Sequence, residues 1–253
     1  MGKITSRQNP RVKYLASLQS RKERKKTQET ILEGPNLIKE ANRAGIDFIE
    51  ILATEDFLAT EGFYFKEKIT LVSEEVMDKI SPTRTPRGII ARIKQPYYPW
   101  QELLGGEKLL LLEGLQDPGN VGTLIRTAAG ADLDGIILLG EGADPYQPKV
   151  LRASAGAIFW IPVGKVKQEE RDSFFSELPR DFSLYVAQPG QGRDFRQVKF
   201  APKSVLVLGH ETRGISGDFS GRSVKKVSIP LAREIESLNV AAAGAILIWA
   251  MQS

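Results

Sequence analysis

Three segments of the chain place polar side chains directly after apolar runs, where they could bind a ligand or take part in a reaction. The first, residues 113–126, holds Asn120 in a glycine-rich turn that leads into a helix expected from about Val121 to Ala131, on which Arg126 lies. The free N–H groups and the dipole at the start of a helix can bind an anion. The segment lacks the G-x-G-x-x-G order of dinucleotide-binding loops, which disfavours a nicotinamide cofactor. For Arg126, an ordinary salt bridge within the helix is the alternative.

The second segment follows the apolar run Val205–Leu208 and contains Gly209, His210 and Glu211. A carboxylate directly after a buried strand must be hydrogen-bonded or hydrated, so Glu211 is a candidate site residue. Gly209 has no Cβ and lets a ligand approach the backbone closely. A helix cap and loop is an equally good interpretation. His210 could act as a general base, but no residue nearby in sequence would orient it.

The third segment runs from Ile229 into the last helix and contains Ser237 and Asn239. Either side chain could simply cap that helix, which we expect from about Ser237 to Met251. Five small residues, Ala241–Ala245, lie near its start and would let another backbone come close. We therefore expect this helix to pack tightly, either on its own sheet or on a second subunit.

These segments lie among alternating strands and helices that predict a parallel sheet. Continuous apolar runs are typical of buried parallel strands, and the helices between them would cover both faces. Open α/β sheets bind ligands at the carboxyl ends of their strands, where all three segments fall. The strands are expected at residues 108–113, 135–140, 158–163, 184–187, 205–209 and 227–229.

The composition excludes several classes of protein. The 253 residues include no cysteine and one histidine, so we expect no disulfide framework, no thiolate nucleophile and no metal site. No apolar run approaches the roughly 18 residues that a membrane span needs. The N-terminus lacks the apolar core of a secretory signal. Together these features predict a cytoplasmic protein.

Positive charge is concentrated near the N-terminus, although the net charge of the chain is only +4. Residues 1–44 hold 11 Lys and Arg against 4 Asp and Glu, whereas residues 101–253 hold 17 against 18. This asymmetry suggests that one end of the chain meets a polyanion, although a solvated helix face would give the same pattern. The basic residues concerned are Arg7, Arg11, Lys13, Arg21, Lys22, Arg24, Lys25 and Lys26.

The chain is expected to divide into two domains. Residues 1–95 form a small α/β domain, and residues 107–253 form the larger domain with the parallel sheet. Between them, Gln95–Trp100 contains two prolines and no periodicity, so residues 96–106 are expected as a linker.

Taken together, the three segments resemble the signature motifs of the SpoU/TrmH family in the SPOUT methyltransferase superfamily. The matching stretches are Gln116–Gly122 with Arg126, Leu208–Ile215, and Ile229–Leu231 followed by Ser237–Val240. The resemblance covers about residues 109–251. Three N-terminal stretches are similar to an RNA-binding domain that some members carry: Asn9–Lys13, Glu33–Ile38 and Thr85–Ile89.

The resemblance implies an S-adenosylmethionine-dependent RNA 2'-O-ribose methyltransferase. It also implies a deep trefoil knot in the C-terminal domain and a homodimer whose active site uses both subunits. The implied catalytic residues are Arg126, Asn120, Glu211, Ser237 and Asn239. Cofactor contacts are implied for Gly209, Ile229 and Leu238, with Leu231, Ala187 and Gln188 as further candidates.

Two residues depart from the family pattern. His210 replaces a small or amide residue, and Arg233 stands where many members have glycine. Arg126 matches the catalytic arginine, and because a guanidinium rarely gives up its proton, we expect it to position a phosphate and stabilise the developing alkoxide.

Ribosomal RNA is the expected substrate, because the resemblance extends to the N-terminal domain that many members acting on ribosomal RNA carry. The alternatives are transfer RNA, or a protein of the same fold that binds ribosomal RNA during assembly without turnover. The combined presence of Asn120, Arg126, Glu211 and Asn239 favours catalysis, since a pure binding protein does not need them.

Overall fold

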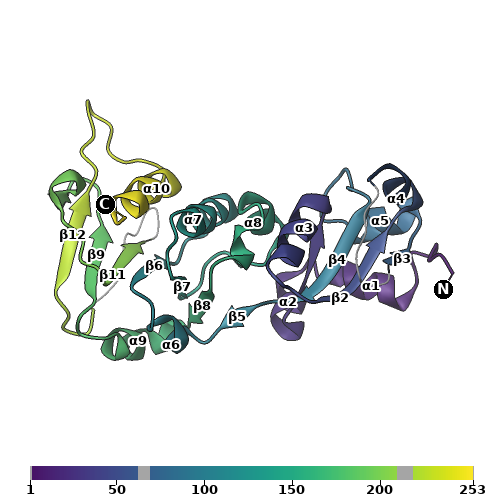
Figure 1. Ribbon diagram of the computed structural model, residues 1–253, viewed down its shortest axis with the longest axis horizontal. Coiled ribbons are helices and arrows are strands. Elements are labelled where there is room, and N and C mark those ends of the chain that lie inside the picture. The colour runs from purple at the N-terminus through teal and green to yellow at the C-terminus, as the bar shows by residue number, and fades with distance from the viewer. Residues whose placement is uncertain (1, 62–68, 210–218, 253) are drawn as a thin grey trace. The chain divides into compact units, whose positions relative to one another are not determined.

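The computed structural model describes residues 2–61, 69–209 and 219–252, which belong to two compact units (Figure 1). The first unit comprises Met1–Pro96 and Asp144–Phe159, and the second comprises Tyr97–Ala143 and Trp160–Ser253. Each unit has its own sheet. The chain passes between the units three times, because a stretch from the middle of the second unit's sequence belongs to the first.

The second unit is built on an eight-stranded sheet in the order β10-β12-β9-β11-β6-β7-β8-β5. Every pairing between these described strands is parallel, which confirms the predicted parallel α/β sheet. The strands are β5 (Tyr97–Tyr98), β6 (Lys108–Glu113), β7 (Gly135–Leu139), β8 (Val163–Val166), β9 (Ser183–Ala187), β10 (Arg193–Asp194), β11 (Ser204–Leu208) and β12 (Val224–Ser228).

Helices cover both faces of this sheet, as Figure 1 shows. Alternate residues of a strand point to opposite faces. Leu109 and Leu111 of β6 share a core with Trp100 of α6 and Phe174 of α9, whereas α10 packs against α7 and β11. The helices are α6 (Trp100–Leu103), α7 (Pro118–Gly130), α9 (Arg171–Glu177) and α10 (Val240–Ala250), with short 3-10 turns η2 (Gln168–Glu170) and η3 (Phe195–Gln197).

Residues 96–106, expected as a linker, contain two elements that pack into the second unit. Strand β5 pairs with β8 at the edge of the sheet. Trp100 is 5% exposed, and its ring meets the ring of Phe174 edge-on at 5.4 Å. The segment therefore contributes to the core of the second unit, because its aromatic and apolar side chains gain more from burial than from exposure.

One predicted strand is wrong. Residues 158–163 were expected to be extended, but Ala157–Phe159 forms the 3-10 helix η1 and β8 begins only at Val163. An apolar run gives no periodicity that separates a strand from a buried turn. Here the buried Ile158 lies in the stretch that belongs to the first unit.

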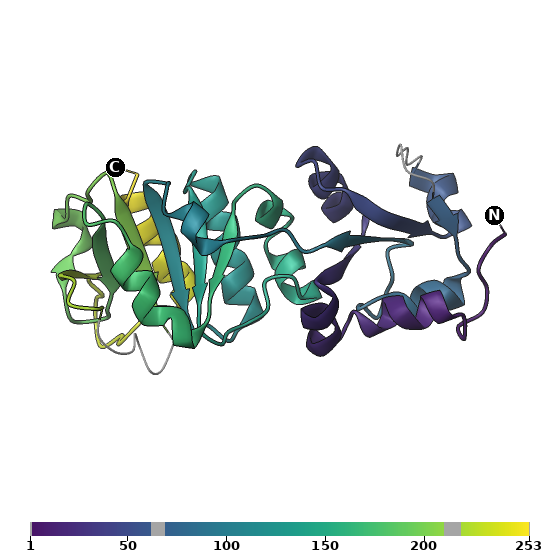
Figure 2. The ribbon, with the colours of Figure 1, turned by 90° about the horizontal axis from the view of Figure 1, so that it is seen from below.

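The first unit has a four-stranded sheet in the order β1-β4-β2-β3. Helices α1 and α5 lie side by side (Figure 2), and their apolar residues share a core with Ile31, Leu52 and Ile90 of the sheet. The strands are β1 (Glu29–Glu33), β2 (Phe48–Ala53), β3 (Ile69–Leu71) and β4 (Ile89–Lys94). The helices are α1 (Pro10–Ser17), α2 (Arg21–Thr27), α3 (Pro35–Arg43), α4 (Glu55–Glu61), α5 (Glu74–Ile80) and α8 (Pro148–Ala153).

Candidate functional site

A pocket lies at the carboxyl ends of β9 and β12, beside α10. Six of the residues predicted from the sequence line it: Ala187, Gln188, Ile229, Leu231, Ser237 and Leu238. The two strands are parallel neighbours, with Val227 paired to Ala187, and the Gln188 N–H donates to the Val227 carbonyl at 2.9 Å. Residues 40 positions apart in the sequence therefore meet at one edge of the sheet, where open α/β sheets bind their ligands.

The lining of this pocket is mostly apolar, with a few polar groups at its margin. Leu231, Leu238 and Leu247 supply hydrocarbon surface. Gln188, Ser228 and Ser237 supply an amide and two hydroxyls. Ligand pockets typically combine such surface with a few polar groups that fix orientation. Such a lining offers apolar surface that can cover a ring and a few groups that can form hydrogen bonds with hydroxyls.

Sequence reasoning missed five residues of this lining, namely Pro189, Val227, Ser228, Ala243 and Leu247. For two of them a signal was present, because Val227 and Ser228 belong to the predicted strand 227–229. Residues at the carboxyl end of a strand lie at the edge of the sheet that binds ligands, so they are themselves candidate site residues. Ala243 and Leu247 lie one helical turn apart in α10, a spacing visible only once the helix face toward the pocket is known.

Of the second motif, Leu208–Ile215, the structure describes only Leu208 and Gly209. Gly209 follows β11 directly and is half-buried, but it is not among the residues that line the pocket. His210 and Glu211 lie outside the described residues. The predicted roles of all three stay predictions.

The side chains of Asn120 and Asn239 meet although they are 119 positions apart in sequence. Asn239 Nδ2 donates to Asn120 Oδ1 at 3.0 Å. Asn239 also caps α10, since its Oδ1 accepts from the N–H groups of Ala241 at 2.8 Å and Ala242 at 3.3 Å. Asn120 lies in the first turn of α7, where Asp117 Oδ1 accepts its N–H at 2.9 Å. Two helix N-termini, each the positive end of a dipole, are thus joined by one amide pair.

Arg126 does not join this pair within its own chain. It lies six residues after Asn120 on α7, which corresponds to about 9 Å along the helix axis and about 240° around it. Its side chain is exposed. Within the part of the chain that the structure describes, its guanidinium has no hydrogen bond or ion pair, so the salt bridge considered as its alternative role is absent there.

The small residues of α10 serve packing within the second unit. A Cβ on Gly244 would lie 2.3 Å from Leu124 Cδ2 and 2.7 Å from Leu208 Cδ1, so α10 sits close against α7 and β11. Elsewhere on the helix, Trp249 is 57% exposed and Ile246 is 37% exposed. The expected tight packing on the helix's own sheet is confirmed, and an apolar surface remains open to solvent.

Two family models match the chain. The model described as SpoU rRNA Methylase family matches residues 107–249, which is more than half of the chain and includes the pocket and the amide pair. The chain belongs to this family. A second model, described as MRM3-like substrate binding domain, matches residues 9–91.

Known relatives and solved structures of the same kind cover nearly the whole chain. The 23S rRNA (guanosine(2553)-2'-O)-methyltransferase RlmP of Bacillus subtilis is 31% identical over 98% of both chains. The mitochondrial rRNA methyltransferase 3 of Homo sapiens is 29% identical over 92% of this chain and 69% of its own. The AdoMet-bound rRNA methyltransferase from Sinorhizobium meliloti is 27% identical, with a TM-score of 0.85 over 99% of this chain and 97% of that one.

These comparisons confirm the predicted family, the α/β fold and the cofactor. The protein is an S-adenosylmethionine-dependent methyltransferase of the SpoU family. The lining of the pocket fits this cofactor in its chemistry, because the adenosine half has the heterocycle and sugar hydroxyls that the side chains suit. The trefoil knot and the homodimer stay predictions.

The SpoU pattern also explains an unusual backbone position in the cofactor loop, which we define as residues 229–238 because both of its ends line the pocket. Arg233, which stands where many members have glycine, has a φ of +62°. This left-handed conformation is unfavourable for a residue with a Cβ. The loop thus keeps the glycine conformation with an arginine in it, at the expense of backbone strain.

The basic N-terminal residues of this SpoU protein fall into two groups. Six have exposed side chains that could meet RNA: Arg7, Lys13, Arg21, Lys22, Lys25 and Lys26. The other two make contacts within the first unit. The Arg24 side chain is 3% exposed and its Nε donates to Asp144 Oδ2 at 2.8 Å, so it is used within the first unit. Arg11 is half-buried, pairs with Glu50, and donates to Thr70 Oγ1 at 3.3 Å.

Arg11 belongs to a chain of buried charges on the first sheet. Arg92 bridges Glu50 and Glu29, and the Tyr14 hydroxyl donates to Glu29 Oε2 at 2.6 Å. Burial alone would raise the pKa of Glu29, but hydrogen bonds from Tyr14, Lys94 and Arg92 outweigh it and lower the pKa below its usual value. This cluster stabilises the ionised carboxylate and fixes the strands.

Over residues 2–61, 69–209 and 219–252, no helix is long and apolar enough to cross a membrane. Over the same ranges, no group of three or more His, Cys, Asp or Glu side chains could hold a metal ion.

Proposed function

We propose that this protein methylates a ribose 2'-hydroxyl of ribosomal RNA, in the cytoplasm. The observation that carries the proposal is the meeting of two motifs at one sheet edge. Leu238 lines the pocket, and the next residue, Asn239, is hydrogen-bonded to Asn120 of the first motif. The relatives support this substrate, since RlmP is named for a 2'-O-methylation of 23S ribosomal RNA.

The chain's own residues must align the hydroxyl and favour its alkoxide character. When bound, S-adenosylmethionine supplies a methyl group that its positively charged sulfur makes electrophilic. Asn120 and Asn239 would orient the ribose hydroxyl, and Ser237 would hold the cofactor side of the pocket. Arg126 would bind the neighbouring phosphate and stabilise charge on the attacking oxygen. Glu211 would hold Arg126 or the cofactor loop.

A second copy of the chain would complete this site. Arg126 faces away from Asn120 around α7, so it would reach the amide pair only from a partner. The exposed Trp249 and Ile246 of α10 offer apolar surface for such contact. A homodimer through the second unit, with the knotted cofactor loop that the family resemblance implies, is therefore part of the proposal.

The six exposed basic residues of the N-terminal region would contact RNA phosphates. Each phosphate contact releases counterions, so affinity should fall as salt rises. Replacing Lys22, Lys25 and Lys26 by alanine should weaken binding to all RNAs alike and flatten the salt dependence.

The test is methyl transfer from labelled S-adenosylmethionine to unmodified ribosomal and transfer RNA fractions, followed by mass spectrometry of the nucleosides. A ribose-methylated nucleoside from ribosomal RNA is expected. Arg126→Ala should bind the cofactor normally but lose at least 100-fold in turnover, because removing one stabilising donor costs about 10²–10³. Product only in transfer RNA would favour that substrate. Cofactor binding without transfer to either would favour the assembly protein.

A further inference from the structure

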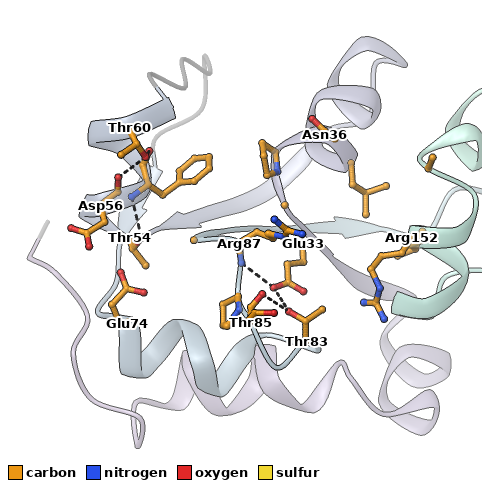
Figure 3. Close-up of a pocket in the computed structure, with 18 residues that line it drawn as sticks. Glu33, Asn36, Thr54, Asp56, Thr60, Glu74, Thr83, Thr85, Arg87 and Arg152 are labelled. Atoms are coloured by element: carbon orange, nitrogen blue, oxygen red, sulfur yellow. Dashed lines mark hydrogen bonds between the residues drawn. The ribbon is translucent and has the colours of Figure 1, made fainter.

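The first unit has a pocket of its own, with a volume of about 810 Å³ (Figure 3). Glu33, Arg87 and Arg152 are among the residues that line it. Most of the lining falls within residues 9–91, which match the MRM3-like substrate binding domain. Contact with the substrate at this pocket would therefore restate what that match already indicates. A buried ion pair in the second unit has no such explanation.

Arg171 and Glu113 form this ion pair. Arg171 is the first residue of α9, and Glu113 is the last residue of β6. The distance from Arg171 Nε to Glu113 Oε1 is 3.6 Å, and each side chain is 8% exposed. Burying two charges costs much of what their attraction returns, and an apolar pair of similar volume is often as stable or more stable. Net stability therefore does not account for the pair, whereas its place in the fold suggests a role.

The guanidinium of Arg171 also contacts two aromatic rings. Its Cζ lies 4.8 Å from the centroid of the Phe175 ring and 5.4 Å from that of the Phe219 ring. These two rings meet edge-on, with their centroids 5.0 Å apart. A planar guanidinium can stack on rings and pair with a carboxylate at the same time, whereas the ammonium of a lysine is a compact point charge. Arg171 thus joins Glu113, α9 and Phe219 in one cluster.

The residues that Arg171 joins flank two of the three motifs. Glu113 is followed directly by the turn that leads to Asn120. Phe219 is the first described residue after the second motif. Strands β6 and β11 are paired neighbours, so both motifs leave the sheet side by side. A single side chain therefore contacts the strand end before the first motif and the chain after the second.

Further contacts attach Phe219 to the region of α9. The N–H of Arg222 donates to the Phe219 carbonyl at 3.0 Å. The Arg222 guanidinium in turn donates to carbonyls just after α9, namely those of Leu178, Pro179 and Phe182. The chain that follows the second motif is thus held at both ends of this helix. The contact at the start of α9 is the one that also reaches the ligand edge of the sheet, through the carboxylate at the end of β6.

We propose that Arg171 is a positioning residue for methyl transfer, which fixes the strand end before the first motif relative to the chain after the second. The inference rests on the proposed function and adds to it a residue outside the lining of the cofactor pocket. An apolar pair in its place would keep the fold but would not impose one arrangement, because apolar contacts have no preferred direction. Misplacement of reacting groups by about 1 Å can cost about 100-fold in rate, so turnover should depend on the pair.

The experiment compares stability, cofactor binding and turnover in the full-length protein. Arg171→Ala leaves the Glu113 carboxylate buried without this cation, so the melting temperature should fall by about 10 °C. Arg171→Met with Glu113→Leu removes both charges, and its melting temperature should stay within about 3 °C of the wild-type value. This double variant should bind S-adenosylmethionine as the wild type does in calorimetric titrations. Its kcat for methyl transfer to ribosomal RNA should nevertheless fall about 100-fold.

Lys203→Met with Asp181→Leu is the matched control and should keep the wild-type kcat. It removes an ion pair of the second unit that precedes β9 and β11, at the opposite end of the sheet.

Wild-type kcat in the folded double variant at positions 171 and 113 would overturn the inference and leave the pair a structural contact. A melting temperature of that variant as low as that of Arg171→Ala, with cofactor binding and kcat lost together, would also overturn it, because folding would then require the pair. Methyl transfer by the wild type is measured in the same preparation. If the wild type binds S-adenosylmethionine but methylates neither ribosomal nor transfer RNA, the proposed function fails and the inference fails with it. Normal wild-type transfer with an unaffected double variant rejects the inference alone.

Discussion

Replacing Arg24 by alanine should destabilise the first unit strongly, although its sequence context is a cluster of surface cations. The guanidinium makes three contacts: Asp144 Oδ2 at 2.8 Å and the carbonyls of Leu18 at 3.0 Å and Gln19 at 2.7 Å. The side chains of Arg24 and Asp144 are 3% and 8% exposed. Alanine would leave a buried carboxylate without a cation and two carbonyls without their donor.

The expected loss follows from that burial. Removing one partner of a buried ion pair costs about 3–5 kcal/mol, most of it from the charge left behind. We therefore expect Arg24→Ala to lower the free energy of unfolding of the first unit by about 3–5 kcal/mol. For a chain of this size, each kcal/mol corresponds to about 2–4 °C in the melting temperature. Urea denaturation followed by circular dichroism measures the change.

Two controls separate burial from charge. Lys22→Ala, on the same helix but exposed, should change stability by less than about 0.5 kcal/mol. Arg24→Met with Asp144→Leu removes both charges and should recover most of the lost stability. A destabilisation by Arg24→Ala below about 1 kcal/mol would refute the reasoning, because the unpaired buried carboxylate that remains should cost more than that.

Three other perturbations test separate parts of the structure. Asn239→Asp keeps the oxygen that caps α10 but loses the donor to Asn120, so the melting temperature should stay within about 3 °C while methyl transfer falls about tenfold. At position 233, Arg233→Gly should be about 1 kcal/mol more stable than Arg233→Ala in urea denaturation, because only glycine relieves the positive φ. The lowered pKa of Glu29 contributes stability that is present above the unfolded pKa near 4.5 and lost as pH falls through the folded pKa. Glu29→Gln should therefore flatten the loss of stability below about pH 5 in acid titrations.

The sheet edge that binds the cofactor could be predicted from the sequence, because short stretches of sequence indicate the strands and the residues that follow them. Apolar runs mark parallel strands, and the residues after those strands share one edge of the sheet. Ala187, Gln188, Ile229, Leu231, Ser237 and Leu238 were named from the resemblance to the family motifs, and they meet in one pocket at this edge. The hydrogen bond between Asn120 and Asn239 could not be predicted in this way, since no sequence pattern indicates that two amides 119 positions apart will pair.

The N-terminal region was less predictable, because charge counting does not say which face of a helix is buried. Arg24 sits among four other cations in Arg21–Lys26, yet its partner Asp144 is 120 positions away. The pocket of the first unit is likewise assembled from four separate stretches of chain. Glu33, Arg87 and Arg152 carry no common spacing, so only the folded chain brings them together.

The discontinuous make-up of the first unit affects how the protein is made. Residues 144–159 leave the ribosome after residue 96, at a synthesis rate of about 5–20 residues per second. For roughly 3–13 s, therefore, the first unit lacks α8 and the carboxylate for Arg24. Folding of this unit must wait for a segment that follows three strands of the second sheet, so the two halves of the enzyme cannot mature one after the other.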